Sequence, residues 1–203
     1  MASAGRPRTF DRDEALKKAM MMFWEKGYEG TTMSDLINAV GMKAPSVYAA
    51  FGNKDQLFNE VIQLYASRIS NGPLRILNET SGVDDAFENL FTENIRSFTN
   101  GGNPTSCLIM TAAINCAPEH SKHVETLKHL RSVYKDAFKA RLMRAVAEGQ
   151  LQHDSDADAL AEFYATFAHG LALRAKDGAS RQELETSCQL ALQTLKGAIR
   201  TAR

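Results

Sequence analysis

The sequence contains no apolar run of about 18 residues or more and no leader with a basic start, an apolar stretch and a small-residue cleavage site. We therefore expect neither a membrane span nor a secretory signal, and we expect the protein in the cytoplasm. Cysteine is also scarce, because Cys107, Cys116 and Cys188 form an odd set without a Cys-x-x-Cys pair. This pattern argues against a secreted disulfide framework and fits a reducing compartment.

Motifs of common enzyme classes are missing as well. The chain has no Gly-x-Ser-x-Gly nucleophile elbow, no glycine-rich phosphate loop and no His-Glu-x-x-His zinc pair, so we predict a protein that is not an enzyme and needs no cofactor. Cys116, His120 and His123 have a spacing that a soft metal accepts, but Pro118 interrupts any shared helical face and no fourth ligand follows. We predict no metal site and keep metal sensing as the lesser alternative.

The net charge is zero, with 24 basic and 24 acidic residues, which argues against a protein that coats nucleic acid with its whole surface. The distribution of charge is more informative than its sum. Arg6 and Arg8 near the N-terminus, and Lys43 and Lys54 within residues 36–54, lie in stretches that contain no acid. These two basic patches are compatible with local binding of nucleic acid.

Apolar residues recur three and four positions apart and alternating β-branched runs are few, so we predict an all-α fold of about nine helices. Caps and breakers place the predicted N-terminal helices at residues 11–27, 32–41, 45–51 and 53–71. Later helices are expected at residues 84–99, 105–115 and 119–148, followed by two helices that Ser155 and Ser180 cap.

The two short helices on either side of Gly41 have the pattern of a helix-turn-helix, whose second helix can lie in the major groove of DNA. The face of that helix opposite the core must be small or polar to approach base edges. The residues that meet this demand are Lys43, Ala44, Ser46, Ala49 and Ala50, and the first four are the candidates for positions near the bases. The candidates for phosphate contacts are Thr32, Tyr48 and Lys54, and those for an adjacent minor groove are Arg6 and Arg8. The alternative is that Tyr48 is an aromatic residue at the rim of the core and that the basic residues form only a solvated surface.

A set of residues at fixed spacings runs through the same region. Its members are Phe23, Gly27, Tyr28, Thr31, Thr32, Met33, Gly41, Met42, Tyr48, Phe51, Asn53, Lys54 and Leu57. With these residues the segment 11–58 resembles the N-terminal domain of the TetR (tetracycline-repressor-like) family of bacterial transcription regulators. The resemblance implies a DNA-binding domain over residues 1–52 and an effector-binding and dimerisation domain over residues 53–203. It also implies a homodimeric repressor that binds a palindromic operator and is released by a small-molecule effector.

The last two predicted helices carry apolar stripes at helical spacing. The stripes are formed by Leu160, Tyr164, Leu171, Leu184, Cys188, Leu192 and Leu195. Because Phe163 and Leu190 offer each helix a second apolar face for its own core, we predict that the stripes form a four-helix seam between two chains. A core stripe within one chain is the alternative.

Family analogy further implies a ligand pocket between the middle helices. Its candidate residues are Phe87, Phe91, Phe98, Cys107, Met110, Tyr134, Phe138, Phe163 and Phe167. Cys107 follows a Gly-Gly-Asn-Pro loop near the start of a predicted helix, where the helix dipole can lower a thiol pKa. A redox- or electrophile-sensing repressor is therefore one alternative function, and a helical adaptor that binds protein rather than DNA is another.

Overall fold

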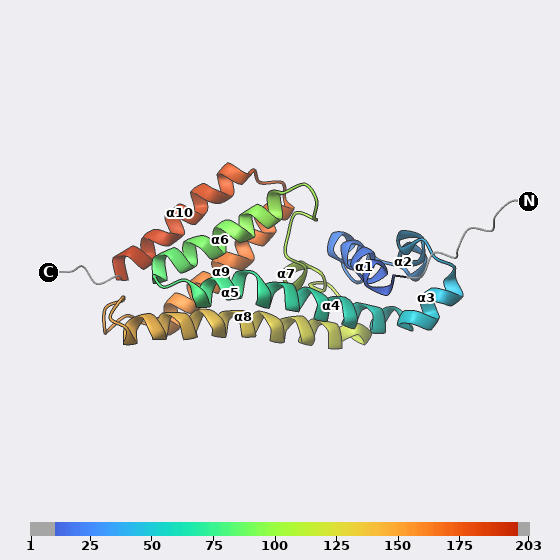
Figure 1. The fold of residues 1–203 in the computed structure, drawn as a ribbon, viewed down its shortest axis with the longest axis horizontal. Helices are drawn as coiled ribbons and strands as arrows, with labels where there is room; N and C mark the ends of the chain where they lie inside the picture. The colour runs from blue at the N-terminus through green and yellow to red at the C-terminus, as the bar shows by residue number, and fades with distance from the viewer. Residues whose placement is uncertain (1–10, 199–203) are drawn as a thin grey trace, which may run out of the picture.

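The computed structural model describes residues 11–198, which form ten α-helices, one 3-10 helix and no strand. The predicted all-α fold is confirmed. The helices are α1 (Arg12–Lys26), α2 (Met33–Val40), α3 (Ala44–Phe51), α4 (Lys54–Asn71), α5 (Pro73–Glu79), α6 (Val83–Thr99), α7 (Leu108–Thr111), α8 (Ser121–Ala147), α9 (Ala157–Lys176) and α10 (Arg181–Ala198), with the 3-10 helix at Pro118–His120. The molecule is elongated: α1 to α3 gather at one end, α6, α9 and α10 at the other, and α4 leads from the first group into the second (Figure 1).

Side-chain caps fix the starts of the N-terminal helices as the sequence predicts. Thr32 forms a capping box with Asp35 at the start of α2, and Asn53 forms one with Gln56 at the start of α4. Gly41 ends α2 with a φ of 75°, a left-handed conformation that favours glycine, and so makes the turn into α3.

Aromatic side chains form the core of the N-terminal end. The rings of Phe23 and Tyr28 each lie 4.9 Å from the ring of Phe58, all three being fully buried. Edge-to-face pairs of this kind add to the free energy gained from burial. Because Phe58 belongs to α4, the first turns of this helix are part of the N-terminal core.

Three features of the C-terminal part differ from the prediction. The helix predicted over 53–71 ends at Asn71 as expected, but an additional helix, α5, begins at Pro73, whose missing N–H lies in a first turn where it would have no partner. The helix expected over 105–115 is only the four-residue α7. The N-cap of α9 is Asp156, whose Oδ1 accepts from the Ala159 amide, and not Ser155.

Arg141 of α8 caps the C-terminal end of α5 by hydrogen bonds to carbonyl groups there. Its side chain is almost fully buried, and its guanidinium donates to the carbonyl oxygens of Leu77 at 3.2 Å, Thr80 at 3.3 Å and Ser81 at 2.9 Å. These carbonyls lie where a helix C-terminus leaves acceptors without partners inside the helix.

The apolar stripes of α9 and α10 face the interior of their own chain. The Tyr164 ring lies 4.6 Å from that of Phe87 on α6, and Leu184 and Leu195 are 2% and 0% exposed. The predicted dimer seam is therefore wrong. Six of its residues are buried within one chain and the seventh, Leu160, packs half-buried on the same core: Leu160, Tyr164, Leu171, Leu184, Cys188, Leu192 and Leu195.

The second face of these two helices, which we expected to supply the core, is the exposed one. Phe163 is 40% exposed, Leu173 51% and Leu190 69%. The helical period shows that a helix has an apolar stripe, but not which element covers it. No helix within residues 11–198 is both long and apolar enough to cross a lipid bilayer.

Candidate functional site

The two faces of α3 differ as a DNA-reading helix requires. Val47 and Phe51 are buried against the N-terminal core, at 0% and 3% exposure. On the opposite side Lys43, Ser46 and Ala49 are exposed and Ala44 is half-buried. Tyr48 is also exposed, at 49%. Apart from this ring and the Lys43 stem, the outer face consists of short side chains, so a base edge can approach the backbone of α3 closely.

The Arg12 side chain of α1 fixes the end of α3. Its Nη2 donates to the Ala50 carbonyl at 3.2 Å and to the Glu60 carboxylate at 2.7 and 2.8 Å, and its guanidinium lies 4.6 Å from the centre of the Phe51 ring. One side chain thus connects α1, α3 and α4. The orientation of α3 is set by this contact and by the buried Val47.

Thr32 is exposed at the start of α2, but its polar groups already have partners. Its hydroxyl and its amide both donate to Asp35 Oδ2, at 2.7 and 2.9 Å. The next amides, of Met33 and Ser34, belong to the first helical turn, where no partner within the helix exists. A phosphate bound at this position would therefore accept hydrogen bonds from these amides, and the negative charge of the nearby Asp35 carboxylate would repel it.

The two lysines of the predicted basic patch have different surroundings. Lys54 is half-buried, and its Nζ lies 4.0 Å from the centre of the Tyr28 ring. Lys43 is exposed at the N-terminus of α3, and no ion pair engages it among residues 11–198. Arg6 and Arg8, the predicted minor-groove contacts, lie outside the described residues.

Hydrogen bonds join the end of α1 to the segment that contains α7. Trp24 Nε1 donates to the Ser106 carbonyl at 2.8 Å, and the Tyr28 amide donates to the Ala112 carbonyl at 2.7 Å. Gly27, between them, has a φ of 73° and a ψ of 174°, and a Cβ there would lie 3.1 Å from the Ala112 oxygen. Only glycine accommodates this backbone and this close approach.

A second connection joins the start of α4 to the start of α8. His123 is 3% exposed, and its Nε2 lies 2.8 Å from Asp55 Oδ1, which also accepts from the Tyr28 hydroxyl. These two hydrogen bonds, the one from Tyr28 first and then the one from His123, lower the pKa of the Asp55 carboxyl.

Glu29, which follows α1, makes a similar connection to the 3-10 helix at Pro118–His120. Its Oε1 accepts from the Ala117 amide at 2.8 Å and lies 2.7 Å from His120 Nδ1, and these contacts lower the pKa of the Glu29 carboxyl in that order. His120 and His123 therefore bond to different carboxylates. Within the described part of the chain, no three His, Cys, Asp or Glu side chains are arranged to hold a metal ion, so the alternative of a site at Cys116, His120 and His123 gains no support.

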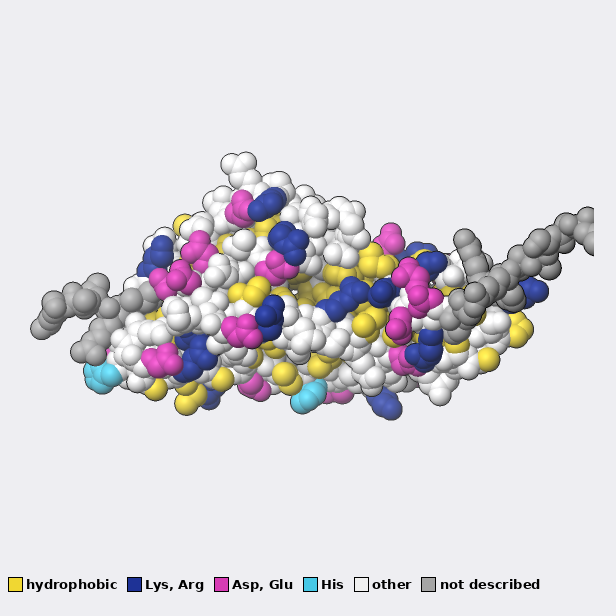
Figure 2. All heavy atoms as spheres, in the orientation of Figure 1, with side chains coloured by type: hydrophobic (Ala, Val, Ile, Leu, Met, Phe, Trp, Pro, Cys, Tyr) yellow, Lys and Arg dark blue, Asp and Glu magenta, His cyan; other side chains and the backbone are white. Residues whose placement is uncertain are grey.

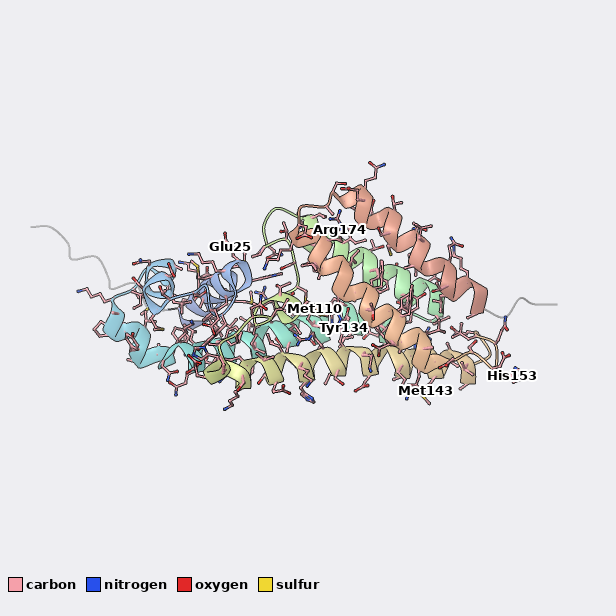
Figure 3. The ribbon with its side chains drawn as sticks, turned by 180° about the vertical axis from the view of Figure 1, so that it is seen from behind. Glu25, Met110, Tyr134, Met143, His153 and Arg174 are labelled. Atoms are coloured by element: carbon pink, nitrogen blue, oxygen red, sulfur yellow. The ribbon has the colours of Figure 1, made fainter. Side chains whose placement is uncertain are left out.

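A cavity of about 290 Å³ lies between α4, α6, α7 and α8, with Ala168 of α9 in its wall. Its polar interior pair is Asn94 and Tyr134, which are 9% and 7% exposed, and Asn94 Nδ2 donates to the Tyr134 hydroxyl at 3.2 Å. Met110 and Tyr134 lie next to each other near the middle of the molecule in Figure 3. The α7 segment is thus one wall of the cavity and also the partner of α1.

The predicted pocket residues separate into three groups. Phe98, Cys107, Met110 and Tyr134 line the cavity. Phe87, Phe91 and Phe138 are fully buried in the closed core beside it, while Phe163 is exposed and Phe167 lines a different, shallow groove between α9 and α10. The sequence pattern missed Tyr65, Asn94 and Leu130, of which Asn94 carried a usable signal as a polar residue on the apolar face of a predicted helix.

The alternative in which the helix dipole lowers the thiol pKa of Cys107 gains no support from the structure. Burial raises the pKa of this thiol, which contacts the Tyr65 hydroxyl. The helix that follows has only four residues and so offers little dipole. A protonated, buried thiol is a poor nucleophile.

A second groove, of about 410 Å³, lies between α1 and the loop before α7, and its lining includes Met21, Trp24 and Lys176. Figure 2 shows a hollow with apolar walls between α1 and the C-terminal helices, with Lys and Arg side chains at its edge.

Comparison with known proteins agrees with this geometry. Residues 15–61 match the model of the bacterial regulatory proteins of the tetR family. The HTH-type transcriptional repressor ComR of Escherichia coli is 34% identical over 195 residues, covering 96% of this chain and 91% of the relative. The HTH-type transcriptional repressor BdcR of the same species is 25% identical over 192 residues, covering 95% and 92%.

The fold is shared with a solved protein–DNA complex. A cysteine variant of the TetR family regulator CifR, complexed with 26-base-pair operator DNA, is 36% identical with a TM-score of 0.88, covering 93% of this chain and 98% of that one. The chain therefore belongs to the TetR family and is a DNA-binding transcriptional regulator. These relatives are regulators rather than enzymes.

Proposed function

We propose that the protein represses transcription by binding a palindromic operator as a homodimer, and that a small molecule in the cavity between α4, α6, α7 and α8 releases it. The observation that carries this proposal is the exposed outer face of α3, where Lys43, Ser46 and Ala49 lie opposite the buried Val47 and Phe51. Names of relatives support repression, since ComR and BdcR are both described as repressors. As a bacterial DNA-binding protein, it would act in the cytoplasm.

The roles of individual residues follow from their positions. Lys43 and Ser46 supply hydrogen bonds near base edges, with Ala44 and Ala49 allowing close approach. Tyr48 and Lys54 contact phosphates, together with the amides that follow Thr32. Arg6 and Arg8 stay the proposed minor-groove contacts.

For the dimer, we propose the exposed face of α9 and α10 in place of the buried stripes. Phe163, Leu173 and Leu190 give this face apolar anchors, and Gly170 lets a partner helix approach α9 closely. α9 crosses the front of the molecule in Figure 3. Two such helices from each chain would form a four-helix bundle.

For the domains, we propose DNA binding over residues 1–52 and effector binding with dimerisation over residues 53–203. Two structural connections between the domains transmit the release. The first is α4, which borders the cavity and continues into the N-terminal core, so an effector that displaces α4 also displaces that core. The second is the α7 segment, whose Ser106 and Ala112 carbonyls accept hydrogen bonds from Trp24 and Tyr28 at the end of α1. The two α3 helices of a dimer then no longer match half-sites about one helical turn, roughly 34 Å, apart.

The test is a selection of bound sites from random DNA, followed by salt titrations of operator affinity. We expect a palindromic site and a salt slope that falls by about one in Lys54→Ala, while Lys196→Ala on α10 leaves it unchanged. Protein without salt-dependent DNA binding would instead favour the adaptor function.

A further inference from the structure

The size of the cavity favours a small ligand. Its volume of about 290 Å³ lies at the small end of the range for ligand pockets and suits a compound of about two aromatic rings. Ile69, Ile109, Met110 and Leu130 supply apolar walls from three helices. A molecule of this size gains most of its binding free energy from the burial of apolar surface.

The polar pair inside the cavity has two donor hydrogens and one acceptor to spare, since only one of the two Asn94 Nδ2 hydrogens is used. The Tyr134 hydroxyl oxygen accepts from Asn94 Nδ2, so the hydroxyl proton is free for another acceptor, and no hydrogen bond within residues 11–198 uses it. The Asn94 Oδ1 likewise has no donor among these bonds. Both side chains are at least nine-tenths buried, and a ligand oxygen beside them gives the Tyr134 proton an acceptor.

The charged residues that line the cavity, Arg68, Glu93 and Arg96, are exposed or half-buried. Arg96 donates to Glu93 at 2.6 and 2.7 Å, so these two charges compensate each other, and Arg68 is exposed to solvent. Behind the cavity wall, the Arg131 guanidinium donates to the Ile109 carbonyl at 2.9 Å. The Cys107 thiol lines the cavity, and burial keeps it protonated by raising its pKa. A carboxylate or phosphate placed beside the pair would lose part of its hydration, and no Lys or Arg side chain within residues 11–198 hydrogen-bonds to either member of the pair to compensate it.

From these observations we propose that the effector is a neutral organic molecule of about two rings, with one oxygen that accepts the Tyr134 proton and lies beside Asn94. A ketone, ester or alcohol has this chemistry, and an organic anion does not. The inference rests on the proposed function of the cavity as the effector site. It restricts that function to one class of ligand.

The test measures how tightly the full chain, in the absence of DNA, binds three small molecules of similar shape. Benzophenone has the oxygen, diphenylmethane lacks it, and 4-benzoylbenzoate adds a carboxylate. By calorimetric titration we expect benzophenone to bind at least tenfold more tightly than 4-benzoylbenzoate and about fivefold more tightly than diphenylmethane. Equal or tighter binding of 4-benzoylbenzoate, or no binding of benzophenone, overturns the proposal.

Two variants test whether the preference for benzophenone over diphenylmethane depends on the Asn94–Tyr134 pair. Tyr134→Phe should remove the difference between benzophenone and diphenylmethane. Tyr164→Phe removes another buried hydroxyl, which lies outside the cavity, and should preserve the difference, so it controls for lost stability. A preference that survives in Tyr134→Phe contradicts the assigned donor.

Irradiation of bound benzophenone locates it, because the excited ketone inserts into neighbouring C–H bonds. Adducts are expected in the peptide that contains Met110, and adducts only outside the cavity overturn the proposal. Operator binding is measured separately on the same protein. Failure to bind DNA contradicts the proposed function, whereas a wrong probe preference with intact DNA binding contradicts only the effector class.

Discussion

Substitution of Gly27 by alanine tests the connection between the DNA-binding end and the cavity wall. The backbone of Gly27, with a φ of 73° and a ψ of 174°, is open essentially to glycine alone. An added Cβ would lie 3.1 Å from the Ala112 carbonyl oxygen, which accepts the Tyr28 amide at 2.7 Å. The substitution therefore strains the backbone and forces α1 away from the α7 segment.

The expected cost has two parts. A residue other than glycine in this region of backbone space costs about 1–3 kcal/mol, and weakening the buried Tyr28–Ala112 hydrogen bond costs about 1 kcal/mol more. We expect Gly27→Ala to lower the free energy of unfolding by about 3 kcal/mol. The matched control is Gly178→Ala, because Gly178 has a φ of 88° but no atom within 4 Å of its would-be Cβ, and there we expect about 1 kcal/mol.

The sequence provides a reporter at the right place. Trp24 is the single tryptophan, and its Nε1 bonds to Ser106 across the same junction. In urea titrations, the midpoint of Trp24 fluorescence should fall more in Gly27→Ala than the midpoint of helical circular dichroism, whereas both should fall together in Gly178→Ala. Equal losses in the two variants would refute the idea that the close approach of Gly27 to Ala112 stabilises the junction.

Three further outcomes follow from the structure. Leu190→Glu should convert the dimer to a monomer in sedimentation without loss of helical content, and an unchanged dimer would disprove the proposed α9–α10 face. The pKa values of Glu29 and Asp55 are lowered from 4.5 and 3.8, so the stability that these carboxylates contribute is complete above those values and is lost as the pH falls through the lowered pKa values. The urea midpoint of Trp24 fluorescence should therefore stay constant down to about pH 5 and fall at lower pH. If the fall persists in the Glu29→Gln, Asp55→Asn double variant, it belongs to other groups. The buried Cys107 should react with a disulfide reagent only in denaturant, and fast labelling of the native protein would contradict its assignment as an inert thiol.

The N-terminal part could be predicted almost completely from the sequence, since its signals are local. The capping boxes of Thr32 and Asn53 and the turn at Gly41 depend on residues only a few positions apart, and all three occur as expected. The exposed face of α3 follows from the same short-range pattern, because Val47 and Phe51 define its buried side. Local hydrogen bonds and backbone preferences decide such features before any distant contact forms.

Predictions about the C-terminal part failed where they depended on which element covers which face. Tyr164 and Leu184 have the spacing expected of a dimer seam, but both are buried within one chain, Tyr164 against Phe87 of α6. Phe87 and Cys107 are both apolar candidates for a pocket, yet only Cys107 borders the cavity.

The sequence by itself therefore determined most of the helices, the helix-turn-helix and the family, because caps, turns and helical periods are encoded within a few residues. Only the tertiary structure decided where the cavity opens, which face of α9 and α10 stays exposed, and that α7 lies between the cavity and α1. Those properties depend on contacts such as Trp24 with Ser106 and Asp55 with His123, which join residues 82 and 68 positions apart. Burial is a property of the packed chain, and no local period specifies the partner that a side chain meets.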